Sequence, residues 1–217
     1  MKEKIRKKAV CLCLMALIFG AAGVCSTDSV RVYADDAYLD DKDKYPPLPP
    51  LYQRDKNVEE LVVPSGEENV ELKDYPYLKK VTLPETMSEI VITGCPLLET
   101  IVVDEENSLF SSVDGVLYDK QGKELLHYPR SKKDTEFVIP DGVEIIKKSA
   151  LASSKWLESV VIPPTVRELE EAAFARSSVR NVKFSEGLEK IRRVAFVGCQ
   201  IGILELPESL KILGDEA

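Results

Sequence analysis

Residues 157–174 read Leu-Glu-Ser-Val-Val-Ile-Pro-Pro-Thr-Val-Arg-Glu-Leu-Glu-Glu-Ala-Ala-Phe, and this stretch decides the fold. Val160 and Ile162 are separated by one residue, which is the period-two alternation of a strand with one buried face. Pro163 follows at once and ends the strand, because proline has no amide hydrogen to donate to a ladder. The segment therefore predicts a very short strand followed by a turn.

The same arrangement recurs along most of the chain. The position of Pro163 is filled seven times with spacings of 20, 20, 36, 23, 22 and 22 residues, at Pro64, Pro84, Asp104, Pro140, Pro163, Ser185 and Pro207. The first and third of the three preceding residues are large and apolar in every copy. After the last four positions, apolar residues stand at +3 and +6 and alanine stands at +10. This is an internal repeat.

Stacking of the copies explains the pattern. A strand of three or four residues cannot bury a face alone, whereas stacked coils share one continuous core. We therefore predict a β-rich solenoid of about seven coils over residues 56–217. A conventional βα domain is disfavoured because crossover helices need 10–12 residues of helical periodicity, and only residues 166–174 approach that length.

The motifs resemble a known family. The run L-x-x-V-x-I-P-x-x-V-x-x-I-x-x-x-A-F-x-x-C describes the BspA-like leucine-rich repeat, and it stands here as residues 157–174 and again as Leu188, Ile191, Ala195, Phe196 and Cys199. The first coils differ, because the 20-residue units around residues 70–76 and 90–96 lack the Ala-Phe pair. The resemblance implies a leucine-rich-repeat fold and an exported bacterial surface protein of the kind implicated in adhesion.

The N-terminus is typical of a signal peptide. A basic stretch precedes an apolar run of 16 residues, 9–24, which is shorter than the ~20 residues of a membrane span. We place cleavage after Ala34, so residues 1–34 are predicted to be a signal peptide and no membrane span is expected after cleavage. An uncleaved anchor and a lipid on Cys25 are the alternatives; Val24 before Cys25 disfavours the second.

Residues 35–55 are predicted to be an acidic and proline-rich linker, with a possible role as an N-terminal cap. Five aspartates between residues 35 and 43 could bind calcium, but no glycine follows to form the tight loop of a calcium motif.

The whole chain of 217 residues has a formal net charge of -8. Residues 1–34 hold six basic and two acidic residues, so the mature chain has 23 basic against 35 acidic residues, a net -12. Such acidity argues against nucleic acid as a partner.

The 36-residue spacing indicates an insertion at about residues 107–136. Residues 115–119 and 124–128 are predicted to form a β-hairpin with residues 120–122 as its turn. Its most economical role is to extend the sheet, with binding as the alternative. At the other end the chain stops at Ala217 without a polar capping unit, so we expect an uncapped or truncated array.

Residues with catalytic chemistry are sparse. His127 is the single histidine, and a surface position in the hairpin is expected for it. Cys95 and Cys199 lie four repeats apart, about 19 Å at ~4.8 Å per strand, so they are predicted to be unpaired thiols in the core. Trp156 is expected to be exposed. The sequence predicts no catalytic residues, no cofactor and no metal site, and hence no enzyme.

Two functions remain open. The first is a non-catalytic, secreted or cell-surface protein whose repeats bind a protein or glycan ligand on a host or bacterial surface. The second is a spacer or targeting module of a larger exported enzyme. If the repeats bind, the outward position of each strand is the candidate surface, because it holds mostly apolar β-branched residues in five successive coils: Val62, Thr82, Val102, Val138 and Val161.

Overall fold

The computed structural model describes residues 25–27, 30–32 and 55–217. The predicted linker with its acidic cluster and proline run, and most of the predicted signal peptide, lie outside these residues. Two short strands of the predicted signal peptide are described: β1 (Cys25–Thr27) pairs antiparallel with β2 (Val30–Val32). Arg31 of β2 pairs in parallel with Leu61.

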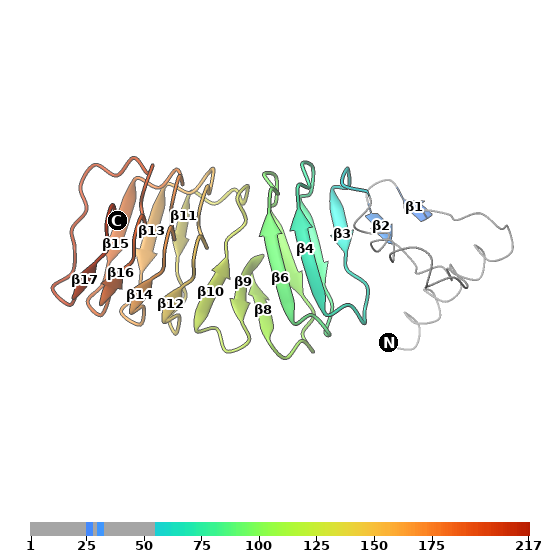
Figure 1. Ribbon diagram of the computed structural model, residues 1–217, viewed down its shortest axis with the longest axis horizontal. Coiled ribbons are helices and arrows are strands. Elements are labelled where there is room, and N and C mark those ends of the chain that lie inside the picture. Colours follow the sequence, from blue (N-terminus) through green and yellow to red (C-terminus); the bar gives the residue numbers. More distant parts are fainter. Residues whose placement is uncertain (1–24, 28–29, 33–54) are drawn as a thin grey trace, which may run out of the picture.

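The chain forms a solenoid of about seven turns with two strand layers and, in the described residues, no helix (Figure 1). The first layer holds β3 (Glu60–Val62), β5 (Lys80–Leu83), β7 (Thr100–Val103), β11 (Glu136–Val138), β13 (Ser159–Ile162) and β15 (Asn181–Phe184). The second layer holds β4 (Asn69–Lys73), β6 (Glu89–Thr93), β12 (Ile145–Ile146), β14 (Glu168–Leu169), β16 (Lys190–Ile191) and β17 (Ile212–Leu213). Successive coils pair in parallel, as Leu61 with Val81 and Val81 with Ile101. The predicted solenoid is confirmed.

The insertion is a three-stranded meander. The predicted hairpin is present as β9 (Val116–Asp119) and β10 (Glu124–His127), and one more strand, β8 (Phe110–Val113), precedes it. Asp114 and Gly115 join β8 to β9 with φ of 50° and 76°, as a tight two-residue hairpin turn requires. Because β10 pairs in parallel with β12, the meander extends the sheet of the second layer, as predicted.

The meander divides the apolar interior into two cores. On β9, Leu117 packs into the core of the first three coils, whereas Val116 and Tyr118 pack into the core of the later coils. Alternate side chains of a strand point to opposite faces, so the single strand β9 can pack against both cores and separate them. All three side chains are buried.

Asn107 is the residue that ends the first stack. Its Nδ2 donates to the carbonyls of Pro84 (3.1 Å), Glu85 (3.2 Å) and Met87 (2.8 Å) in the previous coil. Its Oδ1 accepts from the amides of Leu109 (2.9 Å) and Phe110 (2.7 Å). Asn107 is only 1% exposed, so these five hydrogen bonds are buried or nearly so. This role of Asn107 was not predicted from the sequence.

The later coils are held by an aromatic stack. Phe174 is fully buried and lies parallel to Phe196, with ring centroids 5.0 Å apart and 14° between the planes. Ala150, Ala173 and Ala195 are buried in the turns beside this stack, where only a small side chain fits. The repeated Ala-Phe pair therefore packs each of these coils against the next.

The last coil departs from the expected pattern. Residues 204–206 were predicted to form the seventh strand of the first layer, but they form no strand, and β15 is the last member of its sheet. Ile203 is 83% exposed. The second half of the same coil does pair, because β17 joins β16. The strand prediction for residues 204–206 is wrong because alternation alone does not supply a neighbour that covers the apolar face.

A recurrent backbone strain gives the first testable expectation. Ala172 has φ of 59°, a left-handed conformation that glycine adopts without the clash of a Cβ. We expect Ala172→Gly to raise the free energy of unfolding by about 0.5–1 kcal/mol in urea titrations. Ala175, half-buried in the same turn but without positive φ, is the matched control, and Ala175→Gly is expected to lower stability by about 0.5–1 kcal/mol. Equal effects of the two changes would contradict this account.

Candidate functional site

The five residues of the candidate binding column lie on the outward side of the first layer. Val62, Thr82 and Val102 are in register across β3, β5 and β7. Val138, Val161 and Lys183 are in register across β11, β13 and β15. Val138 is 65% exposed, and the other four residues of the predicted column are half-buried. Each group forms an outward ladder about 10 Å long, at ~4.8 Å per strand.

The meander separates these two ladders. No ladder joins β7 to β11; instead, the tip of the β8–β9 hairpin lies along the edge of β7. The amide of Ile101 donates to the Gly115 carbonyl and that of Val103 to Ser112 Oγ, both at 3.0 Å. This contact brings Val113, which is 57% exposed, to the end of the first ladder. The outward surface is therefore two short ladders with a hairpin tip between them, and not one strip over five coils.

Val113 was not among the residues predicted to bind. An Asp-Gly pair such as Asp114-Gly115 is typical of a hairpin turn, but the periodicity of the coils stops before the insertion, so nothing in the pattern places that turn beside β7. Lys132 Nζ holds the turn from the next coil, at 2.9 Å from Asp114 Oδ2 and 2.9 Å from Asp134 Oδ2. The tip is thus fixed to the solenoid on both sides.

A polar column runs beside the apolar one. Two residues before each outward residue, the first layer presents Glu60, Lys80, Thr100, Glu136, Ser159 and Asn181. Lys80 Nζ lies 3.7 Å from Glu60 Oε2 within this column. The surface therefore offers β-branched side chains next to hydrogen-bonding groups, which is the composition of a contact surface with a polar rim.

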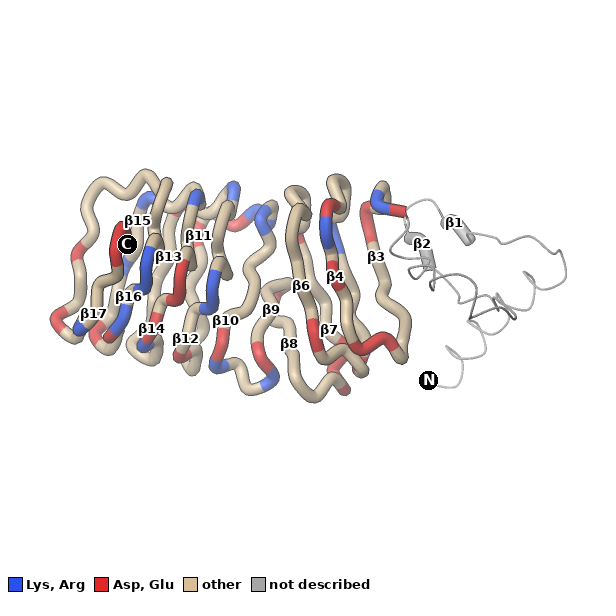
Figure 2. The backbone as a smooth tube through the Cα atoms, in the orientation of Figure 1, with Lys and Arg blue, Asp and Glu red and all other residues tan. Residues whose placement is uncertain are grey.

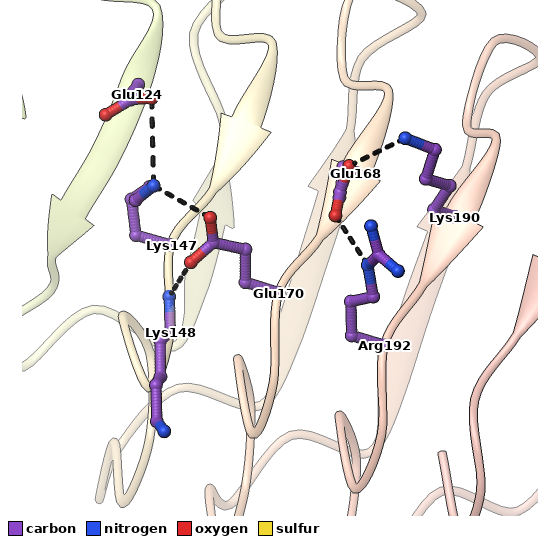
Figure 3. A network of polar contacts seen from close by, with 7 residues as sticks. All are labelled: Glu124, Lys147, Lys148, Glu168, Glu170, Lys190 and Arg192. Carbon is purple, nitrogen blue, oxygen red and sulfur yellow. Dashed lines mark hydrogen bonds and ion pairs between the residues drawn. The ribbon is translucent and has the colours of Figure 1, made fainter.

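The second layer of the later coils carries a different surface made of ion pairs (Figure 2). Lys147 Nζ lies 2.7 Å from Glu170 Oε1 and 3.8 Å from Glu124 Oε1, so it links the coils on either side of it (Figure 3). Arg192 Nε lies 2.6 Å from Glu168 Oε1, and Lys190 Nζ lies 3.2 Å from Glu168 Oε2. The charges alternate in sign from coil to coil, so each coil attracts the next in one register.

The pKa values agree with this pairing. Partial burial raises the pKa of Glu168, but the hydrogen bonds from Arg192 and Lys190 outweigh it, so the net shift is downward. The hydrogen bond to Glu170 raises the pKa of Lys147. A hollow of about 400 Å³ on this surface is lined by Lys148, Glu168, Glu170, Glu171, Arg192 and Arg193. All six are already in ion pairs or hydrogen bonds with one another or with neighbours, so the hollow stabilises the stack rather than offering free charge to a ligand.

His127 is half-buried at the end of β10, so the expectation of a surface histidine is wrong. Burial lowers its pKa to about 4, with a smaller contribution from the positive charge of Arg130. The imidazole is therefore neutral at neutral pH. The strand that carries it packs against both cores through Leu125 and Leu126, which explains the burial.

This burial predicts a pH-dependent stability. The unfolded chain takes up a proton at His127 near pH 6.5, while the folded chain does so only near pH 4. The unfolded state binds more protons between these values, so stability is full above pH 6.5 and falls as the pH drops toward 4. Proton linkage gives a loss of about 2 kcal/mol in the free energy of unfolding between pH 7 and pH 5.

Urea titrations at several pH values test this expectation. His127 is the only histidine, so His127→Gln should flatten the dependence between pH 7 and pH 5.5, above the range where carboxylates titrate. If the stability of the natural protein were already constant between pH 7 and pH 5.5, the imidazole would be solvated in the folded state and this prediction would be wrong.

The remaining candidates have structural surroundings. Cys95 and Cys199 are free thiols, as predicted; Cys95 is buried, which raises its pKa, and Cys199 is half-buried. Cys199 Sγ donates to the Phe174 carbonyl at 3.0 Å. Trp156 is exposed, with Lys155 Nζ 5.2 Å from its ring centroid. In the part of the chain that the structure describes, no group of three or more His, Cys, Asp or Glu residues could hold a metal ion.

Short parallel strands, coils of 20–23 residues and an internal Leu/Phe stack together define a leucine-rich-repeat solenoid. Residues 130–217 match the family described as BspA type leucine rich repeat region, in six copies. These residues thus match the type of repeat that the motifs of the sequence resemble. The earlier coils, with their 20-residue units, lie outside that match.

Solved structures show the same fold. The pneumococcal vaccine antigen PcpA is 25% identical with a TM-score of 0.64, over 68% of this chain and 38% of its own. A leucine rich cell surface protein of Faecalibacterium prausnitzii A2-165 is 22% identical with a TM-score of 0.61, over 74% of this chain and 51% of its own. A leucine-rich repeat protein of Eubacterium ventriosum is 16% identical with a TM-score of 0.53, over 74% and 64%.

This chain accordingly spans less than two thirds of each of these proteins. A search of curated proteins gave no match. Among residues 25–27, 30–32 and 55–217, no helix has the length and apolar character needed to cross a membrane.

Proposed function

We propose that this chain is an exported, non-catalytic repeat protein that is displayed on a bacterial surface and binds a protein or glycan ligand. The observation that supports it most directly is the outward surface of the first layer together with the adjoining tip of the β8–β9 hairpin. There the side chains of Val62, Val102, Val113, Val138 and Val161 are apolar, although a solvated strand would tolerate charged residues at the same positions. Val113 and Val138 are the most exposed of them.

The surroundings of these residues are typical of a surface that contacts another protein. Exposed β-branched residues beside Glu, Lys, Thr and Ser form an apolar centre with a polar rim, which is how many protein contact surfaces are built. Surface display is supported by the predicted signal peptide and by the names of two similar structures, a vaccine antigen and a cell surface protein. The domain boundaries that go with this proposal are residues 1–34, 35–55 and 56–217.

Binding can be measured even though the ligand is unidentified. The protein, purified after export, would be screened on an array of extracellular-matrix proteins and on a glycan array, and the affinity for the strongest binder measured by biolayer interferometry. We expect the double change Val138→Lys with Val161→Lys to weaken binding about tenfold or more, since two lysines desolvate poorly at the centre of a contact.

A matched pair of changes controls for fold and charge. Val197 and Ile212 are exposed apolar residues away from the first layer, and Val197→Lys with Ile212→Lys should leave the affinity unchanged. Unchanged affinity in the Val138/Val161 variant would remove this surface from the site. Failure of the natural protein to bind any member of either array would contradict the proposed binding function.

A further inference from the structure

The second layer contains an open strand edge in the middle of the array. β6 pairs with β4 over five residues, from Asn69–Glu89 to Lys73–Thr93, and these two strands are the whole sheet. Within residues 55–217, β6 has no hydrogen-bonded strand on its other side. The meander strands β8 and β9 come next along the array (Figure 1). This edge lies across the core from the outward ladders of the first layer.

Asn107 is the reason that the edge is open. In the second coil, the amides of Ser88 and Glu89 donate to the Glu68 carbonyl at 2.7 and 3.0 Å and so begin the β4–β6 pairing. One coil later, the amide of Leu109, which is the counterpart of Glu89, and the amide of Phe110 donate to Asn107 Oδ1 instead. The chain then enters β8, which pairs with β9, so the ladder stops at β6.

The side chains of β6 lack the cover that those of β4 have. On the inner side of β4, Val70 and Leu72 are buried, whereas Ile90 and Ile92, in register with them, are half-buried. On the outer side, Val91 is 41% exposed. An added strand would bury apolar area of Ile90 and Ile92, which is a favourable contribution of about 25 cal/mol per Å².

The edge also lacks the usual protection against pairing. Native edge strands are commonly very short or carry lysine or proline. β17 is protected by its length of two residues, and β15 contains Lys183. β6 has five residues, Glu-Ile-Val-Ile-Thr, with neither lysine nor proline. Its composition favours strand addition.

Charge indicates the kind of strand that fits. In the later coils, Glu168 of β14 is the one glutamate on strands β12, β14, β16 and β17, and it pairs with Lys190 and Arg192 of the next coil. Glu71 of β4 and Glu89 of β6 are exposed, and neither forms an ion pair within the described residues. A neighbouring strand with a basic residue opposite Glu89 would supply the missing partner.

We propose that the free edge of β6 binds an extended peptide segment of a partner protein, which adds as a third strand beside β4 and β6. The segment has apolar residues at alternate positions, next to Ile90 and Ile92, and a basic residue next to Glu89. Backbone hydrogen bonds supply affinity, and the alternating side chains supply specificity. This site is separate from the outward ladders, so each of the two proposals can be tested independently of the other.

The test uses a synthetic peptide, Ser-Lys-Ile-Val-Ile-Thr-Gly, which repeats residues 88–94 with lysine in place of Glu89. Fluorescence anisotropy of the labelled peptide gives its affinity for the purified protein. Hydrogen–deuterium exchange should show slower exchange in residues 88–94 when the peptide is bound. A peptide with N-methyl groups on alternate amides loses its hydrogen-bond donors and is expected to bind about tenfold more weakly or worse.

Two protein variants make the assignment specific. Glu89→Lys is expected to weaken binding about fivefold or more, whereas Glu136→Lys, the same charge change on the opposite layer, should have little effect. No binding at millimolar peptide, equal binding of the N-methylated peptide, or equal effects of the two variants would overturn the proposal. Sedimentation analysis showing a dimer that the peptide dissociates would assign the edge to a second copy of this chain and would also overturn it.

Discussion

Asn107→Ala is expected to lower the free energy of unfolding by about 4 kcal/mol, which is exceptional for a single substitution. The side chain is 1% exposed and makes five hydrogen bonds to the backbone of two successive coils. Its removal leaves the carbonyls of Glu85 and Met87 and two amides without this partner, whereas the Pro84 carbonyl keeps the Met87 amide at 3.2 Å. Each unsatisfied buried group costs about 1–3 kcal/mol before relaxation. Urea unfolding monitored by circular dichroism gives the change in stability.

The position of Asn107 predicts more than a uniform loss. Coils of a solenoid are coupled only to their neighbours, so a break between two of them weakens the coupling between the flanking blocks. We expect hydrogen exchange in residues 58–103 to accelerate more than in residues 139–196, so that two unfolding transitions replace one. Asn181→Ala is the matched control, because Asn181 is exposed on β15 and should change stability by less than about 0.5 kcal/mol. A similar small effect at both asparagines would contradict the role given to Asn107.

Much of the fold follows from the spacing of apolar residues. Six of the seven predicted first-layer strands are present, and pairs such as Val81 with Ile101 are in the predicted register. The hairpin turn at residues 120–122 and the free thiols of Cys95 and Cys199 were also predicted correctly. These features depend on period-two burial, turn residues and the rise per strand, all of which are local and repeat along the chain.

The features that were missed depend on contacts between unlike parts of the chain. Asn107 stands three residues after Asp104, at the position that is apolar in the later coils, so the repeat pattern marks it as an exception but does not indicate its hydrogen bonds. The division into two cores requires β9 to turn its side chains to both sides, and the alternation of Val116, Leu117 and Tyr118 shows no polar side at all. A run without a polar face is typical of a strand buried on both sides, and this was the available signal.

The candidate site was predicted in its residues but not in its shape. Val62, Thr82 and Val102 lie outward because their neighbours Leu61 and Val63 point into the core, which alternation alone requires. Whether Val102 and Val138 are adjacent depends on where the insertion goes, and the hairpin tip beside β7 lies between the two ladders. The sequence could place each residue on a face, but only the tertiary structure sets the spacing between the ladders.

Phe174→Ala is expected to cost about 3–5 kcal/mol in the free energy of unfolding. The ring is fully buried between coils and stacks on Phe196 at 5.0 Å, so its removal leaves a cavity that the backbone turns at Ala172 and Arg176, held in left-handed conformations, cannot easily close. Thermal and urea unfolding of the natural protein and the variant give the size of the effect. The loss should be accompanied by faster hydrogen exchange of the amide at position 174, which donates to the Ala195 carbonyl of the next coil at 2.8 Å.

The neighbouring coil supplies the control for this change. Leu151 occupies the position of Phe174 one coil earlier and is fully buried there, so leucine already fits the same turn. Phe174→Leu should therefore cost less than about 1.5 kcal/mol, because most of the buried volume is kept. If the alanine and leucine variants were equally stable, the stack would contribute little, and the shared apolar faces of the strands alone would hold the later coils together. A large difference between them would show that the Ala-Phe pair fixes the coils from within, independently of the ion pairs on the outer surface of the second layer.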